Sequence, residues 1–303
     1  MLEHILVGAD GSPEGRDAVV LGAAIAELAG AELTLVGGCY RHLIPSSGKL
    51  DSESRLEEFR RRITSERDRY APVAQVEVTA DEDAARALCL HARRLRADLV
   101  VIGSSRRAPA GRCAIGRTGR HLLDEIPAGL AIARRGLHQS ATQLSTIAVG
   151  YDGGAESAQA LELAEELAAA ADAALLVDTI YEVPIPALVL GGPEMQQSFE
   201  ELREDERRGA LEVAERAVAR TSRRSQLRVS VGQPGLELRR VSEGVDLMVI
   251  GSRRWGPFAR IVLGGAGEAL TTDCGSSLIV VPHSPPEPDV EVTTTGGARC
   301  SNA

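Results

Sequence analysis

Three short segments in the first part of the chain contain residues of the kind that surrounds a phosphate group. They are Asp10-Gly11-Ser12, Gly103-Ser104-Ser105-Arg106 and Gly116, the last standing thirteen residues after Gly103. Glycines let backbone N–H groups approach an anion closely, and a helix that begins after Gly116 would add a favourable dipole. We expect these segments to bind a mononucleotide where the fold brings them together.

The same segments return once, later in the chain, which indicates two homologous halves. Residues 5–12 reappear as residues 147–154, and residues 97–104 reappear as residues 245–252. The offset grows from 142 to 148 between these anchors and then stays at 148, where Gly264 repeats Gly116. Such internal similarity decides the organisation of the whole chain. The second set of candidate residues is Asp152, Gly153, Gly251, Ser252, Arg254, Gly264, Gly265 and Ala266.

Each half alternates short apolar runs with longer helical patterns, which is typical of strand–helix–strand units and a parallel sheet. Alanine-rich helices are predicted at Pro13–Ala29 and Ala155–Ala171, with Ser12 and Gly154 as their caps. Helices rich in arginine and glutamate, at 52–70 and 198–222, are expected to present a solvated outer face. The predicted strands are 4–8, 32–39, 75–80, 97–103 and 129–134, then 145–150, 174–181, 227–231, 245–251 and 277–282.

The fold class that follows is α/β, with two tandem open five-stranded parallel-sheet domains and helices on both faces. We expect one domain at residues 1–138, a second at 145–283, and a disordered tail at 284–303, where prolines, threonines and glycines show no period. In an open parallel sheet, ligands bind at the carboxyl ends of the strands where the strand order reverses. The loops after strands one and four meet there, so the candidate segments of each half converge.

These residues resemble the universal stress protein family over nearly the whole chain. The halves share its Asp-Gly first loop, its strand ending in Val-Ile-Gly-Ser and its closing apolar strand. The resemblance implies a role in stress adaptation or signalling and a site for ATP, with magnesium accompanying the triphosphate. Carried over by position, Asp10 and Asp152 would meet the adenosine end, and Thr179, matched to Gly38, would lie near adenine. The residues that would surround the phosphates are Gly103, Gly116, Gly251 and Gly264.

The sequence departs from the family pattern in both halves. Arg106 and Arg254 stand at the second glycine, where a side chain either obstructs the backbone approach or neutralises phosphate charge. Arg117 and Gly265 follow the third glycine in place of a hydroxyl residue, and Thr118 could substitute for it in the first half. We expect the second half to be the better nucleotide site, because its glycine-rich segment keeps an open backbone.

Composition excludes several classes of function. Asp and Glu number 43 against 34 Lys and Arg, and a net charge of −9 argues against a nucleic-acid binder. Lys49, the only lysine, is followed by Leu50, so no Walker phosphate loop can exist. The five cysteines have no metal-ligand spacing, and we expect no metal site. No apolar stretch reaches the roughly 20 residues that span a bilayer, and the start lacks a cleavable leader, so we expect a cytoplasmic protein without membrane association.

Two function classes stay open. The first is a module that binds an adenine nucleotide and changes its conformation or partner accordingly. The second is a nucleotide-free scaffold, a pseudo-dimer of two domains within one chain, which acts through protein–protein contacts and could pair further into a homodimer. An enzyme of the ATP-pyrophosphatase type would need a Ser-Gly-Gly-x-Asp-Ser loop, which residues 9–12 and 151–154 lack, so we expect no enzyme. Slow hydrolysis of bound ATP is compatible with the first class.

Two cysteines, Cys39 and Cys113, are predicted to lie near the first site. A redox-sensing role would need a resolving thiol, and none stands close in the sequence. We therefore expect both to be structural thiols.

Overall fold

The computed structural model describes residues 2–40, 49–81, 83–140, 143–182, 193–221, 225–252, 254–255 and 261–282. The predicted tail at 284–303 lies outside these residues. Within the described part of the chain, no helix is both long enough and apolar enough to cross a bilayer.

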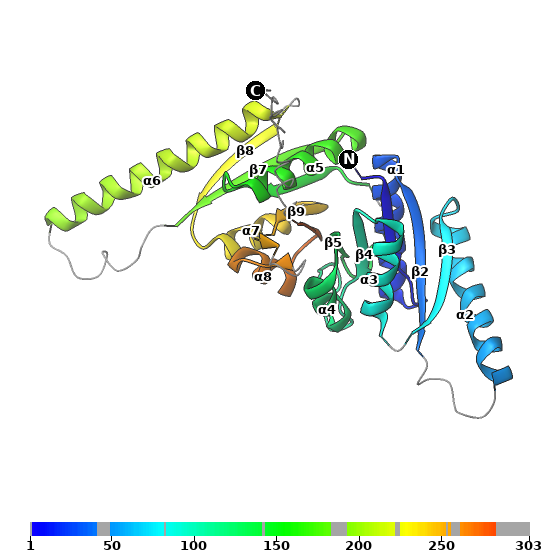
Figure 1. The fold of residues 1–303 in the computed structure, drawn as a ribbon. Helices are drawn as coiled ribbons and strands as arrows, with labels where there is room; N and C mark the ends of the chain where they lie inside the picture. Colours follow the sequence, from blue (N-terminus) through cyan, green and yellow to red (C-terminus); the bar gives the residue numbers. More distant parts are fainter. Residues whose placement is uncertain are drawn as a thin grey trace, which may run out of the picture.

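The first half is a five-stranded parallel sheet (Figure 1). Its order is β3-β2-β1-β4-β5, so the strand order reverses between β1 and β4, which are neighbours. Their carboxyl ends hold the two loops singled out above, which therefore lie side by side. The strands are β1 (His4–Gly8), β2 (Glu32–Tyr40), β3 (Gln75–Asp81), β4 (Leu99–Gly103) and β5 (Gly129–Ala133).

The second half repeats this sheet in the order β12-β9-β6-β7-β8, again with parallel pairs only. All ten predicted strands are confirmed, with ends within two residues of the expected positions. Near-continuous apolar runs such as residues 247–250 form these strands, because both faces of a parallel sheet are covered by helices. The strands are β6 (Thr146–Gly150), β7 (Ala174–Tyr181), β8 (Ser225–Val231), β9 (Leu247–Gly251) and β12 (Ser277–Val281).

The two halves are joined edge to edge, which the sequence pattern does not show. Strand β5 pairs antiparallel with β12, with Leu130 opposite Val280 and Ile132 opposite Leu278. The result is one continuous sheet of ten strands. This pairing covers the exposed edge that each five-stranded sheet would otherwise leave to solvent.

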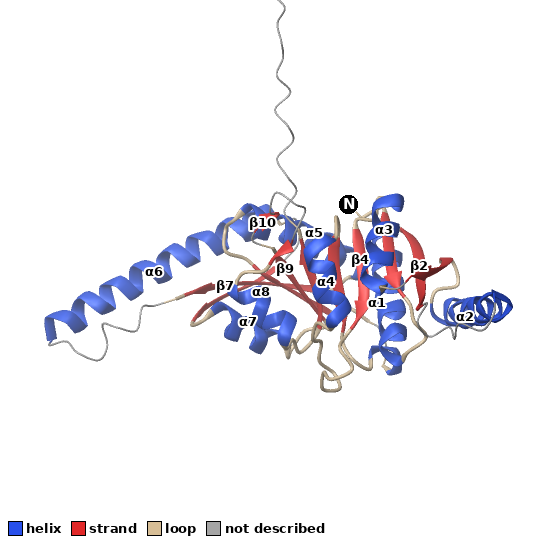
Figure 2. Ribbon diagram, turned by 60° about the horizontal axis from the view of Figure 1, so that its bottom comes forward, coloured by secondary structure: helices blue, strands red, loops and turns tan. Residues whose placement is uncertain are grey.

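Helices cover both faces of the sheet (Figure 2). One core holds residues of α1, α2, α5 and α6, and the other holds residues of α3, α4, α7 and α8, and each core contains residues of both halves. The halves are therefore held together by buried apolar surface as well as by the β5–β12 pair. The helices are α1 (Pro13–Ala29), α2 (Lys49–Tyr70), α3 (Ala84–Leu95), α4 (Arg117–Glu125), α5 (Ala155–Ala171), α6 (Pro193–Arg220), α7 (Pro234–Ser242) and α8 (Gly265–Thr272).

The segment that connects β5 to β6, and so joins the two halves, is anchored by a buried carboxylate. Asp17 of α1 has no exposed surface. It accepts hydrogen bonds from the backbone N–H groups of Gly136 and His138, both at 2.8 Å, and lies 2.6 Å from Nδ1 of His138. The short 3-10 helix Leu137–Gln139 is thereby anchored to the first half.

The connection between β9 and α8 contains a feature that was not predicted. Strands β10 (Arg254–Trp255) and β11 (Ile261–Val262) form a small antiparallel pair. The matching connection in the first half, residues 104–116, contains no such pair; instead Cys113 forms an isolated antiparallel bridge with Cys274 of the second half.

Candidate functional site

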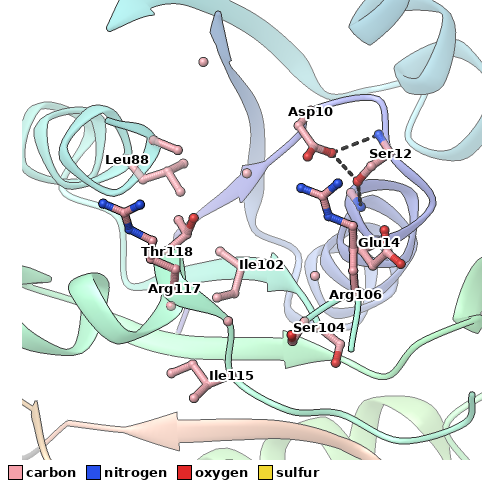
Figure 3. A pocket seen from close by; sticks show the side chains of 18 of the residues that line it. Asp10, Ser12, Glu14, Leu88, Ile102, Ser104, Arg106, Ile115, Arg117 and Thr118 are labelled. Atoms are coloured by element: carbon pink, nitrogen blue, oxygen red, sulfur yellow. Dashed lines mark hydrogen bonds between the residues drawn. The ribbon is translucent and has the colours of Figure 1, made fainter. Parts of the chain in front are cut away.

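A cavity of about 910 Å³ lies at the carboxyl ends of β1 and β4 in the first half (Figure 3). This volume falls within the range of typical small-molecule sites, ~300–1,000 Å³. Gly11 lies in the first loop but outside the lining. The predicted residues that the structure brings together as its lining are Asp10, Ser12, Gly103, Ser104, Arg106, Gly116 and Thr118.

The first loop is held rigidly by hydrogen bonds within it. Oδ1 of Asp10 accepts from the N–H of Ser12 at 2.9 Å and from its hydroxyl, and Oγ of Ser12 accepts from the N–H of Gly15 at 3.0 Å, as the cap of α1. From α2, Arg62 donates to the carbonyl of Gly11, which has a positive φ of 74°. Asp10 is therefore a turn-forming residue and at the same time part of the cavity wall.

Gly103 is required by the fold whether or not a ligand binds. A Cβ at this position would overlap the backbone carbonyl of Glu14, and a Cβ at Gly251 would overlap that of Glu156. In contrast, a Cβ at Gly116 would meet only Ser105, at 3.7–3.8 Å, which is ordinary contact. Close packing of strand against helix thus explains the strand-four glycines, while Gly116 leaves the start of α4 open toward the cavity.

The N-terminus of α4 and four arginines bring positive charge to the cavity wall. Gly116 caps α4 without a side-chain hydrogen bond, so the first N–H groups of the helix point to the cavity unsatisfied by a cap. The cavity-lining arginines form no ion pair among the described residues. Arg135, which lies outside the lining, does form one, with its Nε 3.5 Å from Oε1 of Glu14. An anion placed here would meet unneutralised positive charge. The four arginines are Arg106, Arg107, Arg117 and Arg120.

Another part of the cavity wall is apolar. In the view of Figure 3, Arg106 lies on the side of Asp10, whereas Arg117 and Thr118 lie on the side of Leu88, so positive charge borders this apolar part as well. Its side chains come from β2, β4 and α3, none of them is charged, and we name this part of the wall the apolar slot. A planar ring would bury its faces there, as in typical ligand pockets. The residues of the slot are Val36, Ala84, Ala87, Leu88 and Ile102.

The second half reproduces the first loop with different partners. Oδ1 of Asp152 accepts from the N–H of Gly154 at 2.9 Å and from the hydroxyl of Ser157 at 2.7 Å. Gly153, with a φ of 85°, faces Val213 of α6, where the first half has the arginine of α2. The backbone of the loop is the same, but in the described part of the chain no cationic side chain donates to the carbonyl of Gly153.

The match of Thr179 to Gly38 is wrong by one residue. Gly150 pairs with Asp178 as Gly8 pairs with Val36, so Thr179 corresponds to Gly37, and the constant offset of 142 in this region could have revealed it. Because alternate residues of a strand point to opposite faces, this shift changes which side chain faces the crevice.

Asp178, which sequence reasoning missed, occupies the place of Val36. Its side chain has no exposed surface, and Nε of Arg228 lies 3.8 Å from its Oδ2. Neither carboxylate oxygen has a well-formed hydrogen bond among the described residues. The pKa of Asp178 is raised to about 6, chiefly by burial; the charge of Arg228 opposes this rise and the charge of Glu237 adds to it.

Glu237 itself occupies the place of Ala87. Gly8 faces Leu88 and Ile102, and Gly150 faces Leu238 and Ile250, which aligns α3 with α7. The apolar slot of the first half therefore corresponds to a region with two carboxyl groups in the second half.

The other second-half candidates lie around the same strand ends. Gly251 ends β9, Ser252 is buried and its N–H donates to Val281 at 2.8 Å, and Arg254 lies in β10. Gly264 caps α8, and Gly265 and Ala266 form its first turn. Residues 253 and 256–260 lie outside the described chain, so the expected nucleotide site of this half stays a prediction. No group of His, Cys, Asp and Glu in the described ranges has the arrangement of a metal site.

Comparison with known proteins agrees with this architecture. The sequence profile of the universal stress protein family matches residues 1–134 and again 144–282. Two solved structures from Pseudomonas aeruginosa each have a TM-score of 0.65 and 16% identity. The one from strain UCBPP-PA14, which bears the family name, covers 93% of both chains, and the one from strain PAO1, described as functionally unknown, covers 93% of this chain and 92% of its own.

A third structure, a universal stress protein from Archaeoglobus fulgidus DSM 4304, has a TM-score of 0.62 and 14% identity and covers 92% of this chain and 96% of its own. No curated protein is significantly similar in sequence. At these identities the solved structures show the fold.

Proposed function

The chain belongs to the universal stress protein family, and on that premise we propose that its first half binds an adenine nucleotide, ATP in particular, to act in stress response or signalling. The observation that carries the proposal is the cavity of about 910 Å³, whose wall combines four arginines and a helix N-terminus with a group of apolar side chains. A nucleoside triphosphate has two matching parts, a polyanion and a flat ring.

The arrangement assigns a role to each part of the wall. The phosphates would lie against the first turn of α4 and the cavity-lining arginines, where Thr118 supplies a hydroxyl. The ring would lie in the apolar slot, and Asp10 would accept from the ribose. Magnesium would accompany the triphosphate, and we assign it no protein ligand. The proposal places the protein in the cytoplasm, where it would act by binding and not by catalysis.

This choice reverses the expectation that the second half is the better site. An open backbone at residues 264–267 is not sufficient when the region that would receive the ring holds carboxyl groups. Asp178 is already buried there without a well-formed hydrogen bond among the described residues, and a ring placed against it and Glu237 would supply no positive charge, which is unfavourable. We therefore propose that the second half acts as a scaffold-like partner within the pseudo-dimer. Any contacts with a second copy of the chain or with another protein would be made through this half.

The first test is the number of nucleotides bound by the full chain. The protein would be denatured to release and identify any bound nucleotide, and the stripped protein titrated with ATP and magnesium by calorimetry. One ATP per chain supports the proposal. Two per chain would show that both halves bind, and no heat at millimolar ATP would leave only the scaffold function.

A matched pair of variants assigns the occupied half. In the first half, Gly116→Val fills the start of α4 with a side chain that meets only Ser105, so the fold should stay intact. We expect it to abolish binding, while Gly264→Val leaves the affinity unchanged. The opposite result would place the nucleotide in the second half.

A further inference from the structure

Cys113 and Cys274 lie directly opposite each other across the junction of the two halves. The N–H of Cys113 donates to the carbonyl of Cys274 at 2.8 Å, and the N–H of Cys274 donates back at 3.0 Å. In such a reciprocal antiparallel pair the Cα atoms are about 5.5 Å apart. Disulfides typically join Cα atoms separated by ~4.4–6.8 Å, so the backbone separation expected of this pair lies in the range for a disulfide.

The two thiols share one buried environment. Both cysteines are fully buried in the same apolar core, and both are free thiols. The neighbouring Cys113 thiol lowers the pKa of Cys274 to about 6, and Cys274 together with burial raises the pKa of Cys113. Cys274 is therefore the sulfur that carries thiolate character, and Cys113 is its neighbouring thiol.

The surrounding contacts hold the pair in register. On either side of it, the N–H of Ile115 donates to the carbonyl of Thr271 at 2.7 Å, and Arg112 forms ion pairs with Asp273 and, at 3.2 Å, with Glu243. These bonds all cross from the first half to the second. The two sulfur atoms are thus presented to each other by a fixed frame.

We propose that Cys113 and Cys274 are a redox-sensitive dithiol that a peroxide oxidises to a disulfide linking the two halves of the chain. The Cys274 thiolate attacks hydrogen peroxide, the O–O bond breaks, and a sulfenic acid and hydroxide form. The Cys113 sulfur then attacks the Cys274 sulfur, the S–O bond breaks, the S–S bond forms and water leaves. In total, two thiols give up two electrons and two protons, and one peroxide becomes two water molecules.

The segment that carries Cys113 can admit the oxidant by local opening. Residues 104–116 contain no helix and no strand, and such connections open at lower free energy than the core. Cys89 is the internal comparison: it is buried in α3, burial raises the pKa of this thiol to about 11, and it forms no cross-strand bridge to another cysteine in the described chain. The proposal therefore predicts oxidation at the pair and not at Cys89.

Peptide mapping of the full chain tests this directly. The reduced protein would be treated with hydrogen peroxide, its remaining thiols alkylated after unfolding, and the product digested with trypsin. We expect most chains to contain a linked pair of peptides, 113–117 joined to 261–299, which dithiothreitol separates. The tryptic peptides isolate every cysteine: Cys39 in 17–41, Cys89 in 87–93, Cys113 in 113–117, Cys274 in 261–299 and Cys300 in 300–303.

Two variants and one stability measurement sharpen the result. Cys274→Ser should abolish the linked peptide, whereas Cys89→Ser should keep it. Because the bond would close a long loop, the oxidised wild type should unfold at a higher denaturant concentration than the reduced protein. Two results with the wild type would overturn the proposal. In one, peptides 113–117 and 261–299 are recovered separately and alkylated after peroxide; in the other, Cys274 is joined to Cys39 or Cys300.

Discussion

The two crevices share a backbone and differ in the side chains that face it. Gly103 and Gly251 are glycine in both halves because the helix that follows the first loop lies against them. Where the first crevice has Val36 and Ala87, however, the second has Asp178 and Glu237. The strand-four glycines are thus repeated because the fold requires them, while Val36 and Ala87 of the slot are among the residues that diverged.

The largest effect is expected from making the first crevice resemble the second. The variant Val36→Asp places a carboxyl group in the apolar slot, and desolvating it against a nucleobase should lower the affinity for ATP more than about 100-fold. Calorimetric titration measures the loss. Val36→Ala, which shortens the side chain without adding charge, is the control and should change the affinity less than about tenfold. Near-equal affinities of Val36→Asp and wild type would show that the ring does not enter the slot.

The second largest effect is expected on stability, when the buried carboxyl group of Asp178 is replaced. Its pKa rises from 3.8 to about 6 on folding, so folding is favoured by protonation below pH 3.8, and that contribution is lost as the pH rises through 6. Asp178→Asn should therefore stabilise the protein at pH 7.5 by about 2–3 kcal/mol, and much less at pH 4. Denaturant unfolding at both pH values measures the difference.

The control for that experiment is an exposed carboxylate of the same half. Asp205→Asn on α6 removes a charge whose side chain is 71% exposed, and it should leave stability nearly unchanged at both pH values. If Asp178→Asn also leaves the pH dependence unchanged, the buried carboxyl group does not destabilise the fold at neutral pH, and the two crevices are more alike than their side chains indicate.

Variants of Arg106 distinguish two roles for the arginine that stands in place of the second glycine of the family pattern. If it neutralises phosphate charge, as its lack of an ion-pair partner in the described structure supports, Arg106→Ala should weaken ATP binding about tenfold. If it obstructs the backbone, Arg106→Gly should strengthen binding instead. Arg254→Ala in the second half serves as the matched control and should have no effect when only the first crevice is filled.

The sequence predicted the sheet well because its signals are local. Apolar runs between helical patterns located all ten strands, and Ser12 was placed correctly as the cap of α1. The β5–β12 pair and the contact of Cys113 with Cys274 were not predicted, because they join residues of different halves and no local pattern specifies them. The partner thiol of Cys113 that is missing from its sequence neighbourhood is Cys274, in the other half of the chain.

The sequence-based preference for the second crevice considered only the phosphate side, for a similar reason. Glycine spacing describes only the phosphate side of a site, and residues 264–267 are open on that side. The ring side is built by β2 and α3, or by β7 and α7, whose contributing residues stand far from the glycines in sequence. A one-residue error at Thr179 then hid Asp178, since neighbouring positions in a strand face opposite sides.

The smallest effect is expected at the support of the first loop. Arg62 donates to the carbonyl of Gly11, whereas the second half has Val213 beside Gly153. Arg62→Met keeps the length of the side chain but removes the hydrogen bond, so the loop should be less well preorganised and ATP affinity should fall about threefold. Arg61→Met, at a side chain 79% exposed on the same helix, should change nothing measurable. Because the loop of the second half is held without an arginine, a loss as large as that of Arg106→Ala would mean that Arg62 meets the nucleotide itself and not only the loop.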